Sequence, residues 1–188
     1  MNTVIITLLA ILGVALLIAF FFIGIYNKLV HLKTLVQEAW SNVDVYLKQR
    51  YDLIPNLVNT VKGYATHEQS VFENVTKARA ASMGATSVAD KAQAEAGLAG
   101  ALKTLFAVSE NYPELKANQN FLALQQELAK LEQQLQLARR YYNGTTRNYN
   151  AATQTFPSSI VAGSFGFAPE QFFELDSASE RSTPEVKF

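Results

Sequence analysis

The sequence predicts an all-α protein: an N-terminal transmembrane helix that continues into a long-helix antiparallel bundle of the four-helix type, with a short aromatic-rich C-terminal cap. Three observations predict this class. Residues 1–27 carry no charged side chain, the apolar residues that follow recur at spacings of three and four, and half of the 12 Phe residues lie after position 155. We therefore expect a short N-terminus and membrane helix over residues 1–27, a helical bundle over 28–175 and a C-terminal tail over 176–188.

The N-terminal segment Thr3–Ile25 is apolar almost throughout. At 1.5 Å per residue it spans about 34 Å, enough to cross a hydrocarbon core of roughly 30 Å. It lacks the basic start and small-residue cleavage site of a signal peptide, so an uncleaved anchor is favoured over a signal peptide or a buried core helix. Tyr26 and Lys28 fit an interfacial aromatic ring and a snorkelling cation where the helix leaves the membrane.

The flanks of this segment predict its orientation. Lys28 and Lys33 follow it, whereas only the α-amino group precedes it. By the positive-inside rule, the short N-terminus lies outside and the C-terminal domain lies in the cytoplasm.

Apolar periodicity predicts three amphipathic segments in the bundle. The first continues from the anchor to about Ala78, and a loop follows at Ala81–Lys91. The second covers residues 92–111. The third has a heptad seam and runs towards Gln154; the seam consists of Leu124, Leu128, Leu131, Leu135, Ala138 and Tyr142. Beyond it, we expect a short helix or two, one of them over residues 168–174 with Pro169 in its first turn.

Composition argues against most site chemistry. The chain has no Cys, two His and balanced charge, with 16 basic and 16 acidic residues, so no long-range attraction to nucleic acid is expected. His67 and Glu68 begin a zinc-protease motif, but Val71 stands where its second His belongs. No phosphate-binding glycine loop or nucleophile elbow is visible. We therefore expect no catalytic residue, metal or cofactor, and no enzymatic activity.

The polar stretch Trp40–Tyr64 is interpreted as one helix with a charged face and an apolar face. On the charged face, Asp44 and Lys48 have the spacing of a favourable pair. Arg50 and Tyr51 lie at the boundary, where Arg50 is expected to pair with a carboxylate of a neighbouring helix.

Pro55 is the exception in this stretch, because it removes the hydrogen bond to the Tyr51 carbonyl. Either the helix bends there or two helices meet. Asn56 and Asn59 add polar groups that could bridge to another helix or subunit.

A second polar stretch, Ala138–Asn150, interleaves arginines with tyrosines. Such a pattern can bind single-stranded nucleic acid, but a hydrogen-bonding layer between helices is the favoured interpretation. Across the chain, the residues predicted to contact other helices or subunits are Trp40, Arg50, Tyr51, Pro55, Asn56, Asn59, Arg139, Arg140, Tyr141 and Phe188.

With these stretches assembled, the chain resembles the LemA family of bacterial membrane proteins. The match is carried by the segment from Tyr26 to Ala80, by "AVSENYPELKANQNFLALQQEL", "ARRYYNG" and "FPSSIVAGSFGF", and by the terminal "PEVKF". The resemblance implies an extracytoplasmic N-terminus, one membrane helix, a cytoplasmic helical bundle and no established enzymatic activity. Relatives are associated with membrane organisation, including magnetosome biogenesis, and with gene neighbourhoods that encode a membrane zinc protease.

These observations lead to a functional hypothesis: a non-enzymatic, single-pass scaffold that self-associates and organises the bacterial inner membrane. Its expected partners are the lipid bilayer and further copies of the chain, and not nucleic acid. The alternative is a regulatory adaptor for a membrane protease, which would use the PEVKF tail or the Arg-Tyr surface. An enzyme dependent on Arg50 or Asp52 is a third class.

Overall fold

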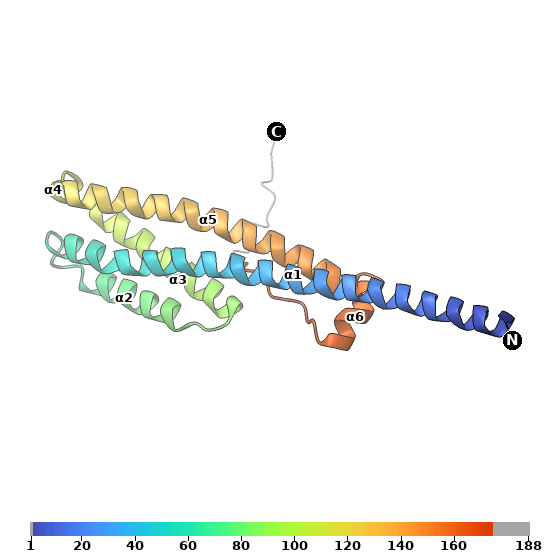
Figure 1. The fold of residues 1–188 in the computed structure, drawn as a ribbon. Coiled ribbons are helices and arrows are strands. Elements are labelled where there is room, and N and C mark those ends of the chain that lie inside the picture. Colours follow the sequence, from blue (N-terminus) through green and yellow to red (C-terminus); the bar gives the residue numbers. More distant parts are fainter. Residues whose placement is uncertain (1, 175–188) are drawn as a thin grey trace, which may run out of the picture. The chain divides into compact units, whose positions relative to one another are not determined.

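The computed structural model describes residues 2–174, and over that range the chain is helical with no strand, which confirms the all-α class (Figure 1). The predicted tail over 176–188, including Phe188, lies outside the described residues. The elements in chain order are α1 (Asn2–Lys62), α2 (Gln69–Gly84), α3 (Val88–Ser109), α4 (Pro113–Lys116), α5 (Gln119–Gln154) and α6 (Ser158–Phe165).

The chain divides into two compact units. The first takes residues up to Ser41 together with Tyr141–Glu170, and the second takes Asn42–Arg140 with the residues from Gln171 on. Helices α1 and α5 therefore each contribute residues to both units.

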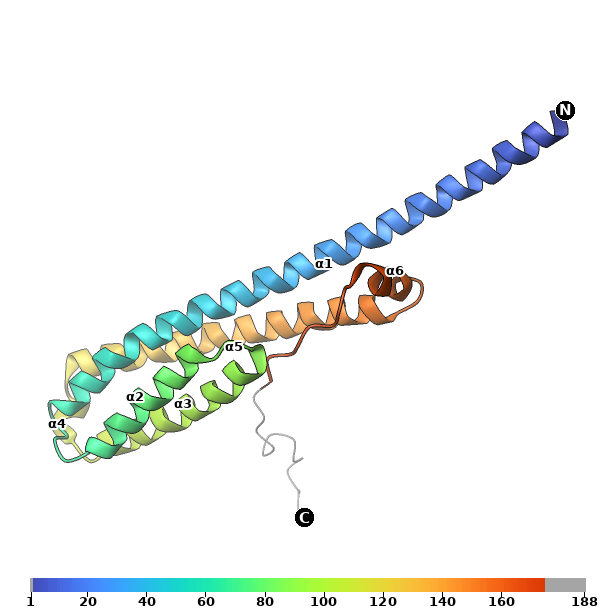
Figure 2. The same ribbon diagram turned by 90° about the horizontal axis from the view of Figure 1, so that it is seen from below.

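In the first unit, the N-terminal part of α1 is long and apolar enough to cross a membrane. None of its most apolar 18-residue window is buried by the rest of the described structure. Burial on α1 begins at Leu29. There α6 packs its buried residues Val161 and Ala162 against Leu29, with Phe22 and Ile25 at the edge of the same cluster. Figures 1 and 2 both show α6 beside this part of α1.

The second unit buries apolar side chains from four long helical segments. Within it, α2 and α3 pack directly on one another, and Figure 2 shows them side by side. Ser87 caps α3 by accepting a hydrogen bond from the Asp90 N–H at 3.0 Å. The buried side chains include Val43, Leu47, Ile54, Leu57 and Val61 of α1, Phe72 and Val75 of α2, Leu98, Leu102 and Leu105 of α3, and Phe121, Leu128, Leu131 and Leu135 of α5.

The heptad seam predicted for the third segment belongs to α5. Leu128, Leu131, Leu135, Ala138 and Tyr142 are buried, while Leu124 is half-buried. The helix also continues through Gly144 to Gln154, as predicted.

The prediction of one helix through Ala78 is wrong, because α1 ends at Lys62 and α2 begins at Gln69. The Ala65 N–H donates to the Val61 carbonyl at 2.9 Å and closes the end of α1. Ala65 and Phe72 are both buried, so apolar residues continue at helix-like spacing through a turn that is not helical. Periodicity alone could not reveal this break.

The short helix predicted over residues 168–174 is also wrong, since the short helix at this end is α6. Asn150 explains the difference: its Nδ2 donates to the Glu170 carbonyl and its Oδ1 accepts from the Glu170 N–H, both at 2.8 Å. These two bonds hold the backbone at Glu170 in an extended form next to α5. Helix α6 ends at Gly166, whose φ of 74° favours glycine.

The Asp44–Lys48 pair expected within α1 is replaced by a contact between helices. Lys91 Nζ of α3 lies 2.7 Å from Asp44 Oδ1. A carboxylate on the boundary of an amphipathic helix can reach a neighbouring helix as easily as its own, and the sequence does not distinguish the two.

Pro55 lies inside α1, which continues without a break to Lys62. The interpretation as one continuous helix is therefore confirmed, and a helix junction at Pro55 is wrong. Proline has no N–H, so the Tyr51 carbonyl lacks its helical donor. Arg79 of α2 supplies the replacement, with Nε donating to the Tyr51 carbonyl at 2.7 Å.

Because Arg79 supplies the donor that Pro55 lacks, we expect the effects of mutations at Pro55 and Arg79 on the free energy of unfolding to be coupled. Arg79→Met should lower the free energy of unfolding by about 1–3 kcal/mol, because it leaves the carbonyl of the buried Tyr51 without a donor. In a Pro55→Ala background the new N–H can serve that carbonyl, so the same change should cost at least about 1 kcal/mol less. Urea unfolding of the full chain in mild detergent, followed by circular dichroism, gives the double-mutant cycle.

Arg140→Met is the matched control, because Arg140 is exposed. An equal cost of Arg79→Met in both backgrounds would show that Pro55 and Arg79 are independent.

Candidate functional site

A cluster of charged side chains lies in the interior of the second unit. Its centre is Glu95 of α3, a carboxylate that is 1% exposed. Arg50 of α1, which is 3% exposed, donates from Nη1 to Glu95 Oε2 at 2.6 Å. The hydroxyl group of Tyr51 donates to the other oxygen, Oε1, at 2.5 Å. Both carboxylate oxygens are therefore engaged by α1.

Helix α5 completes the cluster from a third direction. Glu132 Oε1 lies 2.7 Å from Arg50 Nε, and Arg139 Nη2 lies 3.6 Å from Glu95 Oε2. The guanidinium carbon of Arg139 also lies 4.7 Å from the centroid of the Phe173 ring, a cation–π contact. Two arginines thus face two glutamates, of which Glu95 is buried and Glu132 is 42% exposed.

Burial and the neighbouring carboxylate shift the ionisation of two cluster members. Desolvation raises the pKa of Tyr51 far above its usual range, and the hydrogen bond to Glu95 and the charge of that carboxylate raise it further. Tyr51 therefore remains a protonated donor. Desolvation also lowers the pKa of Arg139, while the charge of Glu95 opposes that shift.

This arrangement is suited to holding helices in register. Moving charges into a protein interior carries a large desolvation penalty, which is offset when the partners are close and hydrogen-bonded. Here one carboxylate accepts from α1 and faces a guanidinium of α5, so sliding α1 or α5 along its axis would separate opposite charges. Within residues 2–174, no group of three or more His, Asp or Glu side chains is arranged to hold a metal ion.

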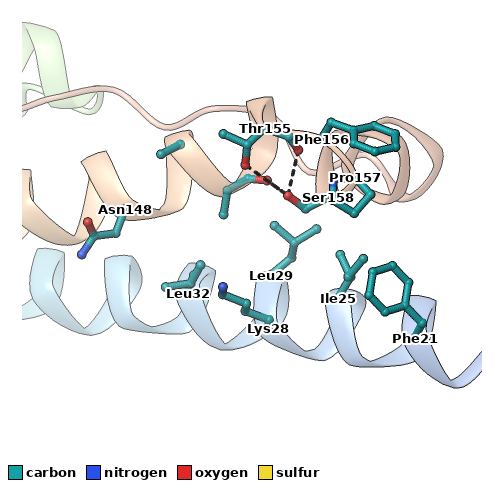
Figure 3. A pocket seen from close by; sticks show the side chains of 12 residues that line it. Phe21, Ile25, Lys28, Leu29, Leu32, Asn148, Thr155, Phe156, Pro157 and Ser158 are labelled. Carbon is teal, nitrogen blue, oxygen red and sulfur yellow. Dashed lines mark hydrogen bonds between the residues drawn. The ribbon is translucent and has the colours of Figure 1, made fainter.

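The first unit contains a second feature, a groove of about 600 Å³ between α1 and the turn that joins α5 to α6. Figure 3 shows Phe21, Ile25 and Leu29 of α1 facing Phe156 and its neighbours across this groove. The remaining lining residues include Lys28, Leu32, Asn148, Thr155, Pro157 and Ser158.

Next to the groove, the ring of Tyr26 contacts the rings of Phe165, the last residue of α6, and Phe167, two residues further on. Its centroid is 4.9 Å from that of Phe165 and 5.6 Å from that of Phe167, both in edge-on geometry. The aromatic residues of the predicted cap are thus found in different places: these two lie against α1 in the first unit, and Phe173 lies beneath Arg139 in the second.

The structure brings three of the predicted contact residues together, since Arg50, Tyr51 and Arg139 meet around Glu95. The expected pairing of Arg50 with a carboxylate of another helix is observed twice. Trp40 is placed elsewhere, 5.2 Å from the ring of Tyr142 in the first unit.

The other predicted residues lie on the surface. Asn56, Asn59, Arg140, Tyr141 and Lys28 are exposed, and Pro55 is half-buried. Contacts of these residues with another subunit stay a prediction.

Sequence reasoning missed Glu95, although a signal was available. Ala92, Glu95, Leu98 and Leu102 recur at spacings of three and four, which places the carboxylate on the buried face of α3. A charge on an otherwise apolar face indicates a buried partner of opposite charge.

A model of the LemA family matches residues 39–188. The chain belongs to the LemA family. The match begins downstream of the apolar N-terminal segment, so the family region of this LemA-family chain includes the Glu95 cluster and α6 but not the α1 side of the groove. A comparison with curated proteins found no match.

The first prediction from the cluster concerns its central carboxylate. Glu95→Leu should lower the free energy of unfolding by about 3–5 kcal/mol, because it removes the buried carboxylate partner of Arg50 and leaves only the partly exposed Glu132. Glu110→Leu is the control: Glu110 pairs with Lys116 on the surface, so its loss should cost less than about 1 kcal/mol. Urea unfolding of the two variants in mild detergent compares them. A cost for Glu95→Leu no larger than the control would contradict a stabilising role for the cluster.

A second prediction concerns alkaline pH. The folded chain holds the Tyr51 proton above the pH at which the unfolded chain releases it, near pH 10. Stability linked to this proton is complete below about pH 10 and is lost above it, by up to about 1.4 kcal/mol per pH unit. In Tyr51→Phe, the free energy of unfolding should therefore fall less steeply between about pH 10 and 11.5 than in the unchanged chain.

Urea unfolding at several pH values measures this slope. Tyr141→Phe, at an exposed position, controls for the loss of a hydroxyl group. Equal slopes for Tyr51→Phe and the unchanged chain would show that the Tyr51 proton is not held on folding.

Proposed function

We propose that this chain is a non-enzymatic, membrane-anchored helical scaffold that self-associates and organises the bacterial inner membrane. The observation that carries the proposal is the continuity of α1 from Asn2 to Lys62. One helix includes both the apolar segment and the residues Arg50 and Tyr51 that tie it to α2, α3 and α5 in the second unit. A helix of this kind suits a protein that holds a folded domain at a bilayer.

The side-chain pattern along α1 supports the anchoring part of the proposal. Large apolar side chains are exposed from Val4 to Ile23, whereas burial begins at Leu29. Exposing such a surface to water is unfavourable, and a lipid bilayer removes that cost. Lys28 and Lys33 after the apolar segment support a cytoplasmic position for the second unit, with the short N-terminus on the opposite side.

The Glu95 cluster supports a structural role in preference to a catalytic one. Both oxygens of its central carboxylate accept hydrogen bonds, and the shifts in pKa keep Tyr51 protonated. A general base needs a free lone pair near the reacting proton. We further propose that α1, α2, α3 and α5 form a bundle of the four-helix type in the second unit, where Phe173 packs on Arg139 as its aromatic cap.

Self-association is supported by apolar side chains that remain exposed in the second unit. Four of them are Val45, Met83, Leu122 and Leu137, which lie on α1, α2 and α5. Single exposed apolar residues are common on soluble domains and do not by themselves establish an interface. These four positions are therefore the ones at which contacts between copies are tested.

The absence of cysteine from the chain makes this testable by cross-linking. Single-cysteine variants Val45→Cys, Met83→Cys, Leu122→Cys and Leu137→Cys are oxidised in intact cells that produce the full chain. At least one should give a disulfide-linked dimer, because contacts between copies at an apolar position bring two identical thiols together. Asn74→Cys and Lys130→Cys, at exposed polar positions, are the matched controls.

The size of the full chain in mild detergent provides the independent measurement. A monomer by native mass spectrometry, together with the same low cross-linking at all six positions, would rule out the self-associating scaffold.

A further inference from the structure

The chain contains a second uncharged stretch, far from the first in sequence. Between Arg147 and Glu170 no side chain carries a charge, and this stretch contains the end of α5, the turn after it and α6. Both uncharged stretches belong to the first unit.

The outward side of this second stretch is strongly apolar. Phe156 is 82% exposed, Ile160 is 52% exposed and Phe165 is 65% exposed. The opposite side of α6 carries Val161 and Ala162, which are buried against α1. Helix α6 is therefore apolar on both sides, and its outward side stays largely exposed although the edge of Phe165 meets Tyr26.

The position of α6 along α1 indicates what meets the exposed side. Val161 and Ala162 pack at the level of Phe22, Ile25 and Leu29. The apolar segment of α1 ends at Ile25, and the first cation follows at Lys28. At a rise of 1.5 Å per residue, α6 lies within about 5 Å of the level at which α1 leaves the hydrocarbon core.

The two serine hydroxyl groups at the ends of α6 are satisfied within the chain, which lowers the cost of their contact with lipid. The Ser158 hydroxyl group lies 2.6 Å from the Ala152 carbonyl and 2.9 Å from the Thr155 carbonyl, and that of Ser164 donates to the Ile160 carbonyl at 2.8 Å. The backbone of Glu170 is held by the side chain of Asn150. Unpaired polar groups are the main obstacle to placing irregular backbone in a membrane.

We propose that α6, with Phe156 before it and Phe165 at its end, is a second membrane-contacting element that inserts into the leaflet from which α1 emerges. Its partner is the phospholipid bilayer: Phe156, Ile160 and Phe165 contact acyl chains. The groove between α1 and the α5–α6 turn, which Phe21, Ile25 and Phe156 line, opens to the same chains (Figure 3). The proposal rests on the anchoring of α1 described above and adds a second, peripheral attachment.

The test is a depth measurement on the full chain in vesicles of phosphatidylethanolamine and phosphatidylglycerol. Because the natural chain has no cysteine, a nitroxide can be attached at one position at a time, in Ile160→Cys and Phe165→Cys. Leu17→Cys, in the exposed apolar part of α1, is the membrane reference, and Arg147→Cys, exposed on α5, is the water reference. Collision of each label with oxygen and with a water-soluble nickel chelate is measured by electron paramagnetic resonance.

Labels at Ile160 and Phe165 should collide several-fold more with oxygen, relative to the nickel chelate, than the label at Arg147. The ratio at Leu17 should be at least as high. A water-like ratio at Ile160 and Phe165 with a lipid-like ratio at Leu17 overturns the second attachment but leaves the anchor intact. A water-like ratio at Leu17 overturns the anchoring itself. Shielding of Ile160 and Phe165 from both reagents indicates protein contact and also overturns the proposal.

A tryptophan variant provides a readout that needs no label. Trp40→Phe combined with Ile160→Trp leaves one tryptophan, at α6, because the natural chain has only one. Lipids brominated on their acyl chains should quench its fluorescence several-fold more than they quench Trp40 in the unchanged chain. Equal quenching in the two proteins contradicts the insertion of α6.

Discussion

The second unit depends on one buried carboxylate. Glu95 is 1% exposed, so its charge must be neutralised by the protein, and the groups that do so come from two other helices. Apolar contacts along the core are tolerant of small shifts, because one aliphatic side chain can replace another as a neighbour. The Glu95 contacts with Arg50 and Tyr51 are specific in distance and direction, so they select one register of α1 against α3.

Tyr51 extends this constraint to a fourth helical segment. Its hydroxyl group is bound to Glu95 of α3, while its carbonyl group accepts from Arg79 of α2. The second bond exists because Pro55 leaves that carbonyl without a helical donor. Pro55 thus weakens α1 as an isolated helix but makes possible a directed contact between α1 and α2. The hydrogen bond lost within α1 is replaced by one from Arg79.

Sequence periodicity was sufficient to predict α5, where Leu128, Leu131 and Leu135 all face the core. It failed at the end of α1, because Ala65 continues the apolar pattern through a turn that buries it. The extended backbone at Glu170 was not predictable locally, since Asn150 holds it from elsewhere in the chain. For the cluster, the sequence predicted that Arg50 meets a carboxylate, but the choice of Glu95 depends on how α3 faces α1. That choice is a property of tertiary packing, which spacing within one helix does not determine.

The distribution of charge explains why the first unit differs from the second. The chain has zero net charge, yet its ion pairs between helices lie in the second unit, whereas both long uncharged stretches lie in the first. Helix α5 makes this possible by continuing past Arg140 to Gln154, so that Ala152 and α6 join the cluster around Leu29. The uncharged stretch between Arg147 and Glu170 is thereby placed against the end of the uncharged stretch of α1. Exposed aromatic rings in water favour aggregation. A single membrane helix would therefore not explain why Phe156 and Phe165 are exposed near the level of Leu29. Their exposure is accounted for by the proposed contact of α6 with acyl chains.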